Sequence, residues 1–357
     1  MFTKSGMASV VIDGQFGSTG KGLIAAYLAK TEMDEGRRCD IATTNAGANA
    51  GHTTIIGGKK FVTFHLPTTA VVQNCRAYVN AGAIIDPKVL LQEIEEVGFD
   101  PSLLTIHPRA AVILDRHKEF ENQSGSMATS LASTRKGVGA ALADKVLRVS
   151  GLAQSIPELK PFIGTIDLNK EMYYRGARVV VEVPQGFSLG INSGLAYPYC
   201  TSRDVTVMQS LSDAGIHPSF LFRTVLSLRT FPIRVGNIVE DGHQKGWSGP
   251  IYPDQEEISF EDLGVPKELT TVTKRVRRIF TFSVRQYEDA CHINRPDFVF
   301  LNFCNYLKTE NQLRKLDTLM AAVWRAPTHF GCGPAVEDVV TSIEEVIKRC
   351  NLQPERQ

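Results

Sequence analysis

The sequence has almost no net charge, because its 39 lysines and arginines are balanced by 38 aspartates and glutamates. A chain without a global basic field is not expected to bind nucleic acid through its overall electrostatics, so any anion site must be local. The chain also lacks an apolar run of the roughly 20 residues that a membrane-spanning helix needs. Its first residues contain no long apolar segment of the kind that secretory signals have. We therefore expect a cytoplasmic protein that binds neither nucleic acid nor membrane.

The seven cysteines are odd in number, widely spread and include no C-x-x-C pair. This pattern argues against a disulfide framework or a zinc site and favours reduced thiols. We find no internal repeat, no low-complexity segment and no convincing linker. With 43% hydrophobic residues, the chain has enough apolar material for a sizeable core. We interpret residues 1–357 as a single large domain with small insertions.

Strand-like and helix-like patterns alternate along the chain. Residues 8–13, 179–183 and 298–303 are short, apolar and rich in β-branched or aromatic side chains, as in strands covered on both faces, and residues 87–97 are an amphipathic helix. This alternation predicts an α/β fold with a mostly parallel central sheet flanked by helices. We also expect a hairpin within residues 53–66 that turns at Gly57-Gly58, a strand over 109–114, a mobile loop over 122–136 and a closing helix over 336–350.

The first motif with chemical meaning is the glycine-rich stretch G-Q-F-G-S-T-G-K-G at residues 14–22, between the strand over 8–13 and a helix that begins near Gly20. This order points backbone N–H groups and a helix N-terminus at phosphate, and Lys21 adds a charge for the β- and γ-phosphates. The loop is P-loop-like but not a standard Walker A motif, because five residues separate Gly14 from Gly20 and Gly22 stands where Ser or Thr would hold magnesium. An ordinary glycine turn is the alternative. Asp13 either takes part in magnesium or proton chemistry or caps the turn.

A second small-residue loop, N-A-G-A-N-A-G-H-T at residues 45–53, follows a strand that we expect over residues 39–44. Its glycines would let the backbone approach a ligand closely. His52 can exchange protons near neutral pH, although a lone histidine is usually structural, so both roles stay open on the residues alone.

The two loops together resemble those of the adenylosuccinate synthetase family, which read Q-W-G-D-E-G-K-G and G-G-H-N-A-G-H-T. Further matches follow in the family's order at residues 65–67, 113–115, 133–145, 185–186, 197–202, 234–236, 273–278 and 333–334. On these co-linear matches the chain is identified as a member of the family. In that family a nucleoside triphosphate phosphorylates the purine 6-oxygen, and the amine of aspartate then displaces the phosphate. Phosphorylation turns a poor leaving group into a good one, and Mg²⁺ is the expected metal.

The resemblance implies a role for each matching residue. The catalytic residues would be Ser18, Lys21 and His52. The triphosphate would contact Gln15, Gly17, Thr19, Gly20, Lys21, Gly22, Gly51, His52, Thr53, Asn305, Gly333 and Pro334. The purine monophosphate would contact Ser18, Asn49, Thr134, Lys136, Arg148, Gln185, Thr201, Val235 and Arg275. Aspartate would contact Thr271, Val272, Thr273, Lys274 and Arg277, and magnesium would contact Ser18 and Gly51. Arg148 matches an arginine that reaches across a dimer interface, which implies a homodimer with this residue contributed in trans. On the residues alone, a solvated charge run is the favoured interpretation of Lys274, Arg275, Arg277 and Arg278; the match to the family reverses this preference.

Ser18 is the most informative departure from the family, which has an aspartate at this position to take the N1 proton and bind magnesium. A hydroxyl is a poor general base, so a disabled enzyme is one interpretation. The other is that a shorter, neutral side chain leaves room for a purine 2-amino group and accepts its hydrogen bond. This change resembles the phage-type branch of the family, which uses dGMP in place of IMP. We therefore predict a carbon–nitrogen ligase that couples L-aspartate to C6 of dGMP with hydrolysis of ATP or dATP, in the host cytoplasm if the chain is phage-encoded. Its product would be 2-amino-2′-deoxy-N6-succinyl-AMP, on the way to 2-aminoadenine DNA precursors.

A second departure concerns the triphosphate. The family's guanine-reading T-K-x-D appears here as N-F-C-N at residues 302–305, and an asparagine amide cannot accept from both guanine donors as a carboxylate does. This favours ATP or dATP over GTP. The alternatives are a conventional adenylosuccinate synthetase acting on IMP and a non-catalytic nucleotide-binding regulator. A dinucleotide-dependent oxidoreductase is disfavoured, because no G-x-G-x-x-G with a following acidic residue occurs in context.

Overall fold

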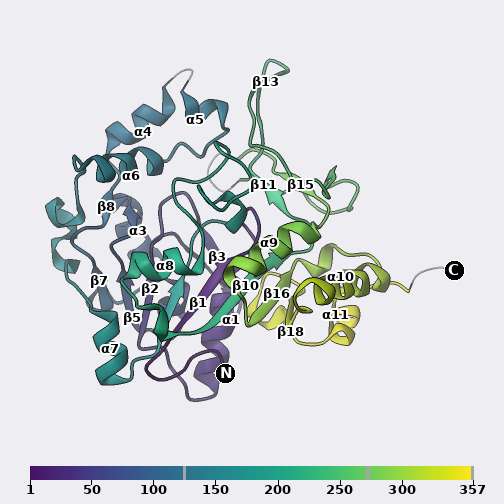
Figure 1. Ribbon diagram of the computed structural model, residues 1–357, viewed down its shortest axis with the longest axis horizontal. Coiled ribbons are helices and arrows are strands. Elements are labelled where there is room, and N and C mark those ends of the chain that lie inside the picture. Colours follow the sequence, from purple (N-terminus) through teal and green to yellow (C-terminus); the bar gives the residue numbers. More distant parts are fainter. Residues whose placement is uncertain (124–125, 271–273, 355–357) are drawn as a thin grey trace.

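The computed structural model describes residues 1–123, 126–270 and 274–354, and its centre is a large twisted sheet (Figure 1). Within the described residues this sheet has nine strands in the order β18-β17-β16-β10-β1-β9-β2-β5-β7. All neighbours run parallel except β17 and β18, which are antiparallel. The predicted α/β fold with a mostly parallel sheet is therefore confirmed. The strands are β1 (Ala8–Asp13), β2 (Ile41–Thr44), β5 (Arg76–Val79), β7 (Leu104–Ile106), β9 (Val179–Glu182), β10 (Leu221–Arg229), β16 (Phe298–Asn302), β17 (His329–Gly331) and β18 (Val339–Val340).

Smaller sheets lie around the central one. They are formed by β3 (His52–Ile56) with β4 (Lys59–Thr63), β6 (Ile84–Ile85) with β8 (Ala111–Val112), β12 (Ile238–Glu240) with β13 (His243–Gly246), and β11 (Ile233–Arg234) with β15 (Arg278–Phe280) and β14 (Glu257–Ile258). The predicted hairpin is confirmed, because β3 and β4 are joined at Gly57 and Gly58, which have φ values of 53° and 79°. Such left-handed pairs suit the two-residue turns of hairpins. The β12–β13 hairpin projects from the body at the top of Figure 1.

Helices cover both faces of the central sheet. The α-helices are α1 (Lys21–Asp34), α2 (Thr68–Gln73), α3 (Pro87–Val97), α4 (Asp115–Asn122), α5 (Met127–Ser130), α6 (Val138–Leu147), α7 (Leu168–Arg175), α8 (Val207–Ala214), α9 (Val284–Asn294), α10 (Glu310–Val323) and α11 (Ile343–Cys350). The 3₁₀ turns are η1 (Pro101–Leu103), η2 (Ala153–Ser155), η3 (Pro157–Phe162), η4 (Phe187–Leu189), η5 (Pro218–Phe220), η6 (Cys304–Tyr306) and η7 (Val336–Asp338). Among the described residues, no helix combines the length and apolar character that crossing a membrane requires.

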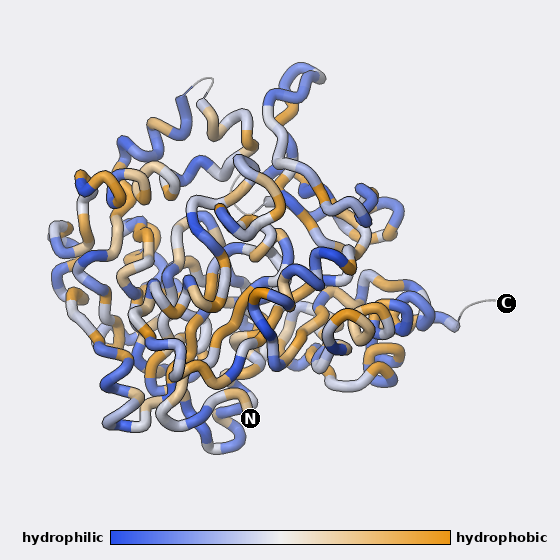
Figure 2. Tube along the Cα trace, in the orientation of Figure 1, coloured by the Kyte–Doolittle hydropathy of each residue, from blue (hydrophilic) through white to orange (hydrophobic). Residues whose placement is uncertain are grey.

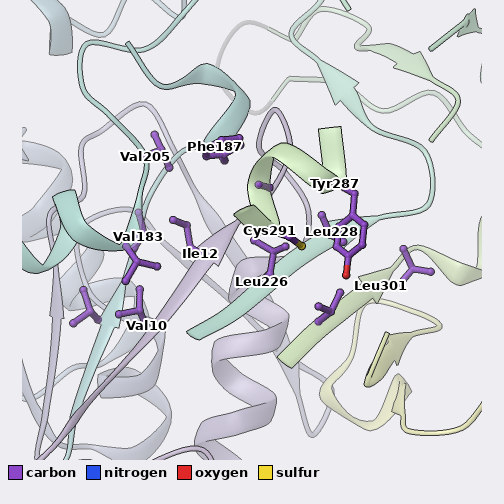
Figure 3. Close-up of a cluster of buried hydrophobic side chains, with 14 of the residues drawn as sticks. Val10, Ile12, Val183, Phe187, Val205, Leu226, Leu228, Tyr287, Cys291 and Leu301 are labelled. Carbon is purple, nitrogen blue, oxygen red and sulfur yellow. The ribbon is translucent and has the colours of Figure 1, made fainter. Parts of the chain in front are cut away.

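The core lies on both faces of β1, whose six residues are all buried. Val10 and Ile12 face one side, where Leu226 and Tyr287 pack in the same cluster (Figure 3). Val11 belongs to the cluster on the opposite side, with Ile24 of α1. Since alternate residues of a strand point to opposite faces, a strand that is apolar throughout must be covered twice. Figure 2 shows this arrangement as apolar strands inside and polar segments at the periphery.

One expectation about local structure was wrong, and two were confirmed only in part. The closing helix over 336–350 is instead a 3₁₀ turn, the short strand β18 and then α11. Val339 pairs with β17, and the Ser342 hydroxyl accepts from the backbone N–H of Glu345, so the helix begins only at Ile343. The expected loop over 122–136 contains α5, with residues 124 and 125 outside the described part, and the expected strand over 109–114 is reduced to β8.

Candidate active site

The glycine-rich loop folds around the carboxylate of Asp13, at the carboxyl end of β1. This carboxylate is fully buried and accepts hydrogen bonds from the backbone N–H groups of Gln15 (2.8 Å) and Gly17 (3.3 Å) and from the hydroxyl of Thr19 (2.6 Å). It also pairs with the Lys21 ammonium at 3.1 Å. Asp13 therefore caps the turn, and its oxygens are occupied by donors from the loop that follows.

Lys21 is the first residue of α1 and is only 7% exposed. Besides Asp13, its ammonium donates to the backbone carbonyl of Gln185 at 2.9 Å. Gly22 follows where a Walker A motif has a hydroxyl, and a Cβ there would lie 2.8 Å from the carbonyl oxygen of Thr53. Gly22 thus allows α1 to pack directly against the start of β3, which brings the glycine-rich loop and the His52 loop together.

His52 begins β3 beside Lys21, and its side chain is 11% exposed. Burial, and secondarily the positive charge of Lys21, lowers the pKa of His52 to about 3, so the imidazole is neutral at physiological pH. Its Nδ1 lies 3.9 Å from a carboxylate oxygen of Glu182, while Nε2 is buried without a hydrogen-bond partner among the described residues. The Glu182 carboxylate accepts from the backbone N–H groups of Thr68 and Thr69 at the start of α2.

A cavity of about 920 Å³ opens where these loops meet. Most of the residues that we predicted from the sequence line this cavity, although they come from segments far apart in the chain. The predicted residues on its wall are Gly17, Ser18, Thr19, Gly20, Lys21, Gly22, Asn49, Gly51, His52, Thr53, Thr134, Gln185, Thr201, Val235, Arg277, Asn305, Gly333 and Pro334. Two of them contact each other directly, because the Gln185 amide donates to the Asn49 side-chain oxygen at 2.9 Å.

Other predicted residues do not line this cavity. Gln15 is buried beneath the loop, and Arg275 donates to the carbonyls of Ala132 and Ser133 behind the wall. Arg148 is exposed at the end of α6. Lys136 and Lys274 also lie off the wall, and Thr271, Val272 and Thr273, which we predicted to bind aspartate, lie outside the described residues.

The sequence interpretation missed several wall residues, notably Glu268, Phe303 and Tyr306. The Tyr306 hydroxyl donates to the Glu268 carboxylate at 3.0 Å. Phe303 directly follows the apolar strand β16, which is the only sequence signal for it. Glu268 precedes the basic stretch, but nothing in its own neighbourhood marks it as part of a pocket.

The fold and the cavity define the class of protein. The chain belongs to the adenylosuccinate synthetase family, since the family model of that description matches residues 10–158 and 149–316. A solved adenylosuccinate synthetase from Plasmodium falciparum has the same fold, with a TM-score of 0.74 at 18% identity over 94% of this chain and 99% of that one.

Relatives from phages resemble the chain over nearly its whole length. It is 40% identical to an N6-succino-2-amino-2′-deoxyadenylate synthase of Salmonella phage PMBT28, over 93% of this chain and 96% of the relative. The solved succinoaminodeoxyadenylate synthetase of cyanophage S-2L, bound to dGMP and to dATP as an energy donor, has a TM-score of 0.85 at 35% identity, covering 97% of this chain and 98% of that one. An adenylosuccinate synthetase of a Pyrococcus species is 35% identical over 78% of each chain.

Proposed function

We propose that this chain is a ligase that couples L-aspartate to C6 of dGMP with hydrolysis of ATP or dATP. The product is 2-amino-2′-deoxy-N6-succinyl-AMP, with ADP or dADP and phosphate. The observation that carries the proposal is that Ser18, an exposed residue, lines the cavity where the family's pattern has an aspartate. The phage relatives support the same substrate, since they are N6-succino-2-amino-2′-deoxyadenylate synthases and one was solved with dGMP bound. We place the reaction in the cytoplasm of an infected cell, because these relatives are phage proteins.

The reaction needs two bond changes. The 6-oxygen of dGMP attacks the γ-phosphorus of the triphosphate, and the bond to the β-phosphate oxygen breaks. The amine of aspartate then adds to C6, and the C6–oxygen bond breaks to release phosphate. Negative charge gathers on oxygens in both steps, so fixed positive groups and N–H donors lower the barrier.

Lys21 and His52 are the residues we assign to this charge. Lys21 lies at the start of α1, where a helix N-terminus and glycine N–H groups also attract phosphate. His52 lines the cavity, and the Nε2 of its neutral imidazole is buried without a hydrogen-bond partner among the described residues; we assign this nitrogen to the 6-oxygen and its phosphoryl group. The negative charge of phosphates near Lys21 would offset the positive charge that helps to lower the pKa of His52. This pKa would therefore rise, and the imidazole would accept a proton more readily, when the triphosphate is bound.

Mg²⁺ is the cofactor we propose. No group of three or more His, Cys, Asp or Glu side chains suited to a metal occurs among the described residues. Ser18 and Gly51 line the same cavity. A hydroxyl and a backbone carbonyl are oxygen donors that fit magnesium, which usually takes few protein ligands and completes its shell with phosphates and water. These two residues would hold the ion, whose charge would stabilise the phosphates.

Aspartate requires a cationic partner for its carboxylates. Arg277 lies on the cavity wall. Burial lowers the pKa of its guanidinium; the charge of Glu268 raises this pKa, and the charge of Arg229 lowers it. A planar guanidinium that is poorly hydrated suits a carboxylate. We assign the α- or β-carboxylate of the substrate to Arg277, with Lys274 and the segment 271–273 completing this subsite.

We also propose a homodimer with Arg148 contributed in trans. Arg148 is exposed, and the neighbouring Val146, Leu147 and Val149 are 73%, 69% and 62% exposed. A cluster of apolar side chains around an arginine is the kind of surface that a second protein copy covers. Sedimentation of the wild type and of Leu147→Glu tests this, because the charge is expected to give a monomer with a raised KM for dGMP.

A matrix of substrates tests the activity. Purified protein is incubated with aspartate, Mg²⁺, one of dGMP, GMP and IMP, and one of ATP, dATP and GTP, and both phosphate release and product mass are read. We expect a product with the mass of dGMP plus aspartate less one water. A preference for IMP would identify a conventional adenylosuccinate synthetase instead, and phosphate release independent of aspartate in every combination would rule out the ligase.

A further inference from the structure

Arg229, the last residue of β10, is the largest fully buried side chain among the described residues. β10 lies between β1 and β16 (Figure 1). In the register of β10 with β16, Arg229 pairs with Asn302. The residue is therefore at the carboxyl edge of the sheet, where the loops that follow both neighbouring strands begin. A permanently charged group is costly to bury unless it is paired and hydrogen-bonded, so its partners matter.

The guanidinium of Arg229 touches three segments of the cavity wall. Its Nη1 donates to the backbone carbonyl of Ser18 at 3.2 Å. The Nη1 and Nη2 groups also donate to the two carboxylate oxygens of Glu268, at 3.3 and 2.5 Å. The ring of Phe303 lies against the cation, with its centroid 3.8 Å from Cζ. One planar cation thus joins the glycine-rich loop, the segment before the basic stretch and the segment after β16.

Two of these contacts hold residues in unfavourable backbone conformations. Ser18 has φ = 54° and Phe303 has φ = 60°, the left-handed region that L-residues rarely adopt. Such conformations persist only where the surroundings enforce them. The hydrogen bond from Arg229 restrains the peptide group that follows Ser18, and with it the direction of the Cα–Cβ bond that carries the hydroxyl. The adjacent Thr230 hydroxyl holds the Phe303 carbonyl in the same way, at 2.8 Å.

Glu268 connects Arg229 to Arg277, which belongs to the proposed aspartate subsite. Burial tends to raise the pKa of Glu268, but the charge and hydrogen bonds of Arg229, the Tyr306 hydroxyl and the charge of Arg277 together bring it below its ordinary value. The carboxylate is therefore ionised. The backbone carbonyl of Glu268 accepts from the N–H of Arg277 at 2.9 Å, so the two residues are tied together along the chain as well.

We propose that Arg229 is a positioning residue that sets two specificities at once. Through its direct bond it holds Ser18 in the orientation that accepts the purine 2-amino group, and through Glu268 it holds the Arg277 segment in place for aspartate. The inference rests on the proposed function. It requires the planar fork of an arginine, because the single ammonium of lysine cannot reach the Ser18 carbonyl and both Glu268 oxygens together.

The test compares Arg229→Lys with Arg223→Lys. Arg223 is on the same strand and also pairs with a carboxylate, Asp297, at 2.7 Å, but its side chain is 39% exposed and does not line the cavity. In Arg229→Lys we expect the ratio of kcat/KM for dGMP to that for IMP to fall about tenfold and the KM for aspartate to rise about tenfold, as for loss of a charge-assisted hydrogen bond. In Arg223→Lys both quantities stay within about twofold, as expected for an exposed pair.

Glu268→Gln is the second variant, because it changes a side chain on the cavity wall and leaves Arg229 in place. We expect the same losses, smaller than additive when combined with Arg229→Lys. If Arg229 only supports the fold, the melting temperature and the active fraction fall while the substrate ratio and the aspartate KM stay unchanged, and the inference is wrong.

Amide hydrogen exchange separates this inference from the proposed function. We expect residues 14–20 and 274–280 to exchange faster in Arg229→Lys than in Arg223→Lys, with or without turnover. Unchanged exchange in both segments overturns the inference even if dGMP is the substrate. Faster exchange in a protein that does not act on dGMP supports the positioning role and rejects the proposed substrate.

Discussion

Replacing Ser18 with aspartate is the most direct test of how this chain chooses its purine. Ser18 is exposed at the cavity and has φ = 54°, a conformation that aspartate adopts more readily than most residues. The change is therefore expected to leave the loop and the fold intact. It alters the size and charge of a residue that we place both at the purine 2-amino group and at the proposed magnesium site.

The size of the effect follows from two contributions. Losing the hydrogen bond between the serine hydroxyl and the 2-amino group costs about 1 kcal/mol. Crowding the amine with a longer side chain costs about 1–3 kcal/mol. The sum predicts that the ratio of kcat/KM for dGMP to that for IMP falls about 30-fold to 1,000-fold. The carboxylate also supplies the general base that the conventional reaction uses, so turnover of IMP is expected to rise.

Ser18→Ala separates the two contributions, since it removes the hydroxyl but leaves the space. The ratio should then fall only about fivefold, the value of one neutral hydrogen bond. Initial rates of aspartate-dependent phosphate release, measured with each monophosphate at saturating ATP, give both ratios. A Ser18→Asp enzyme that prefers dGMP as strongly as the wild type would refute the reasoning, because the hydroxyl would then have no part in selection.

Three further predictions concern the other subsites. Asp13→Asn breaks the buried pair with Lys21 and is expected to cost about 3–5 kcal/mol of unfolding free energy in denaturant titrations; an unchanged midpoint would contradict the capping role. The His52 imidazole should not titrate between about pH 5.5 and 8 in the free protein, because its lowered pKa leaves it neutral there, and a non-hydrolysable ATP analogue should raise that pKa as its phosphates offset Lys21. Histidine NMR measures both states, and a midpoint near the ordinary value in the free protein would count against the assignment. Asn305→Asp should shift donor competition toward GTP by about tenfold, because a carboxylate accepts from both guanine donors; no shift would mean that Asn305 does not read the base.

The glycine-rich loop shows how far sequence patterns reach. Glycines, a lysine and an apolar strand before them are local features, so the strand, the start of α1 and the phosphate-type loop could be predicted without tertiary information. The same holds for the apolar strands of the parallel sheet. The prediction of a helix over 336–350 was wrong because a non-local contact decided the structure there. Val339 and Val340 pair with β17, and this pairing overrides the local helical pattern.

Taken alone, the sequence determined the fold class, the family and the chemical character of position 18, because these depend on residue type and order. Only the tertiary structure decided which polar groups are already occupied and which face the cavity. The carboxylate of Asp13 accepts hydrogen bonds from the loop that follows it and pairs with Lys21. The Nε2 of His52 has no hydrogen-bond partner among the described residues. Arg229 carries no local signal, since its partners Ser18 and Glu268 lie far away in the sequence. Ser18 meets it because the parallel strands β1 and β10 end at one edge of the sheet, and Glu268 reaches it from the segment between β14 and β15.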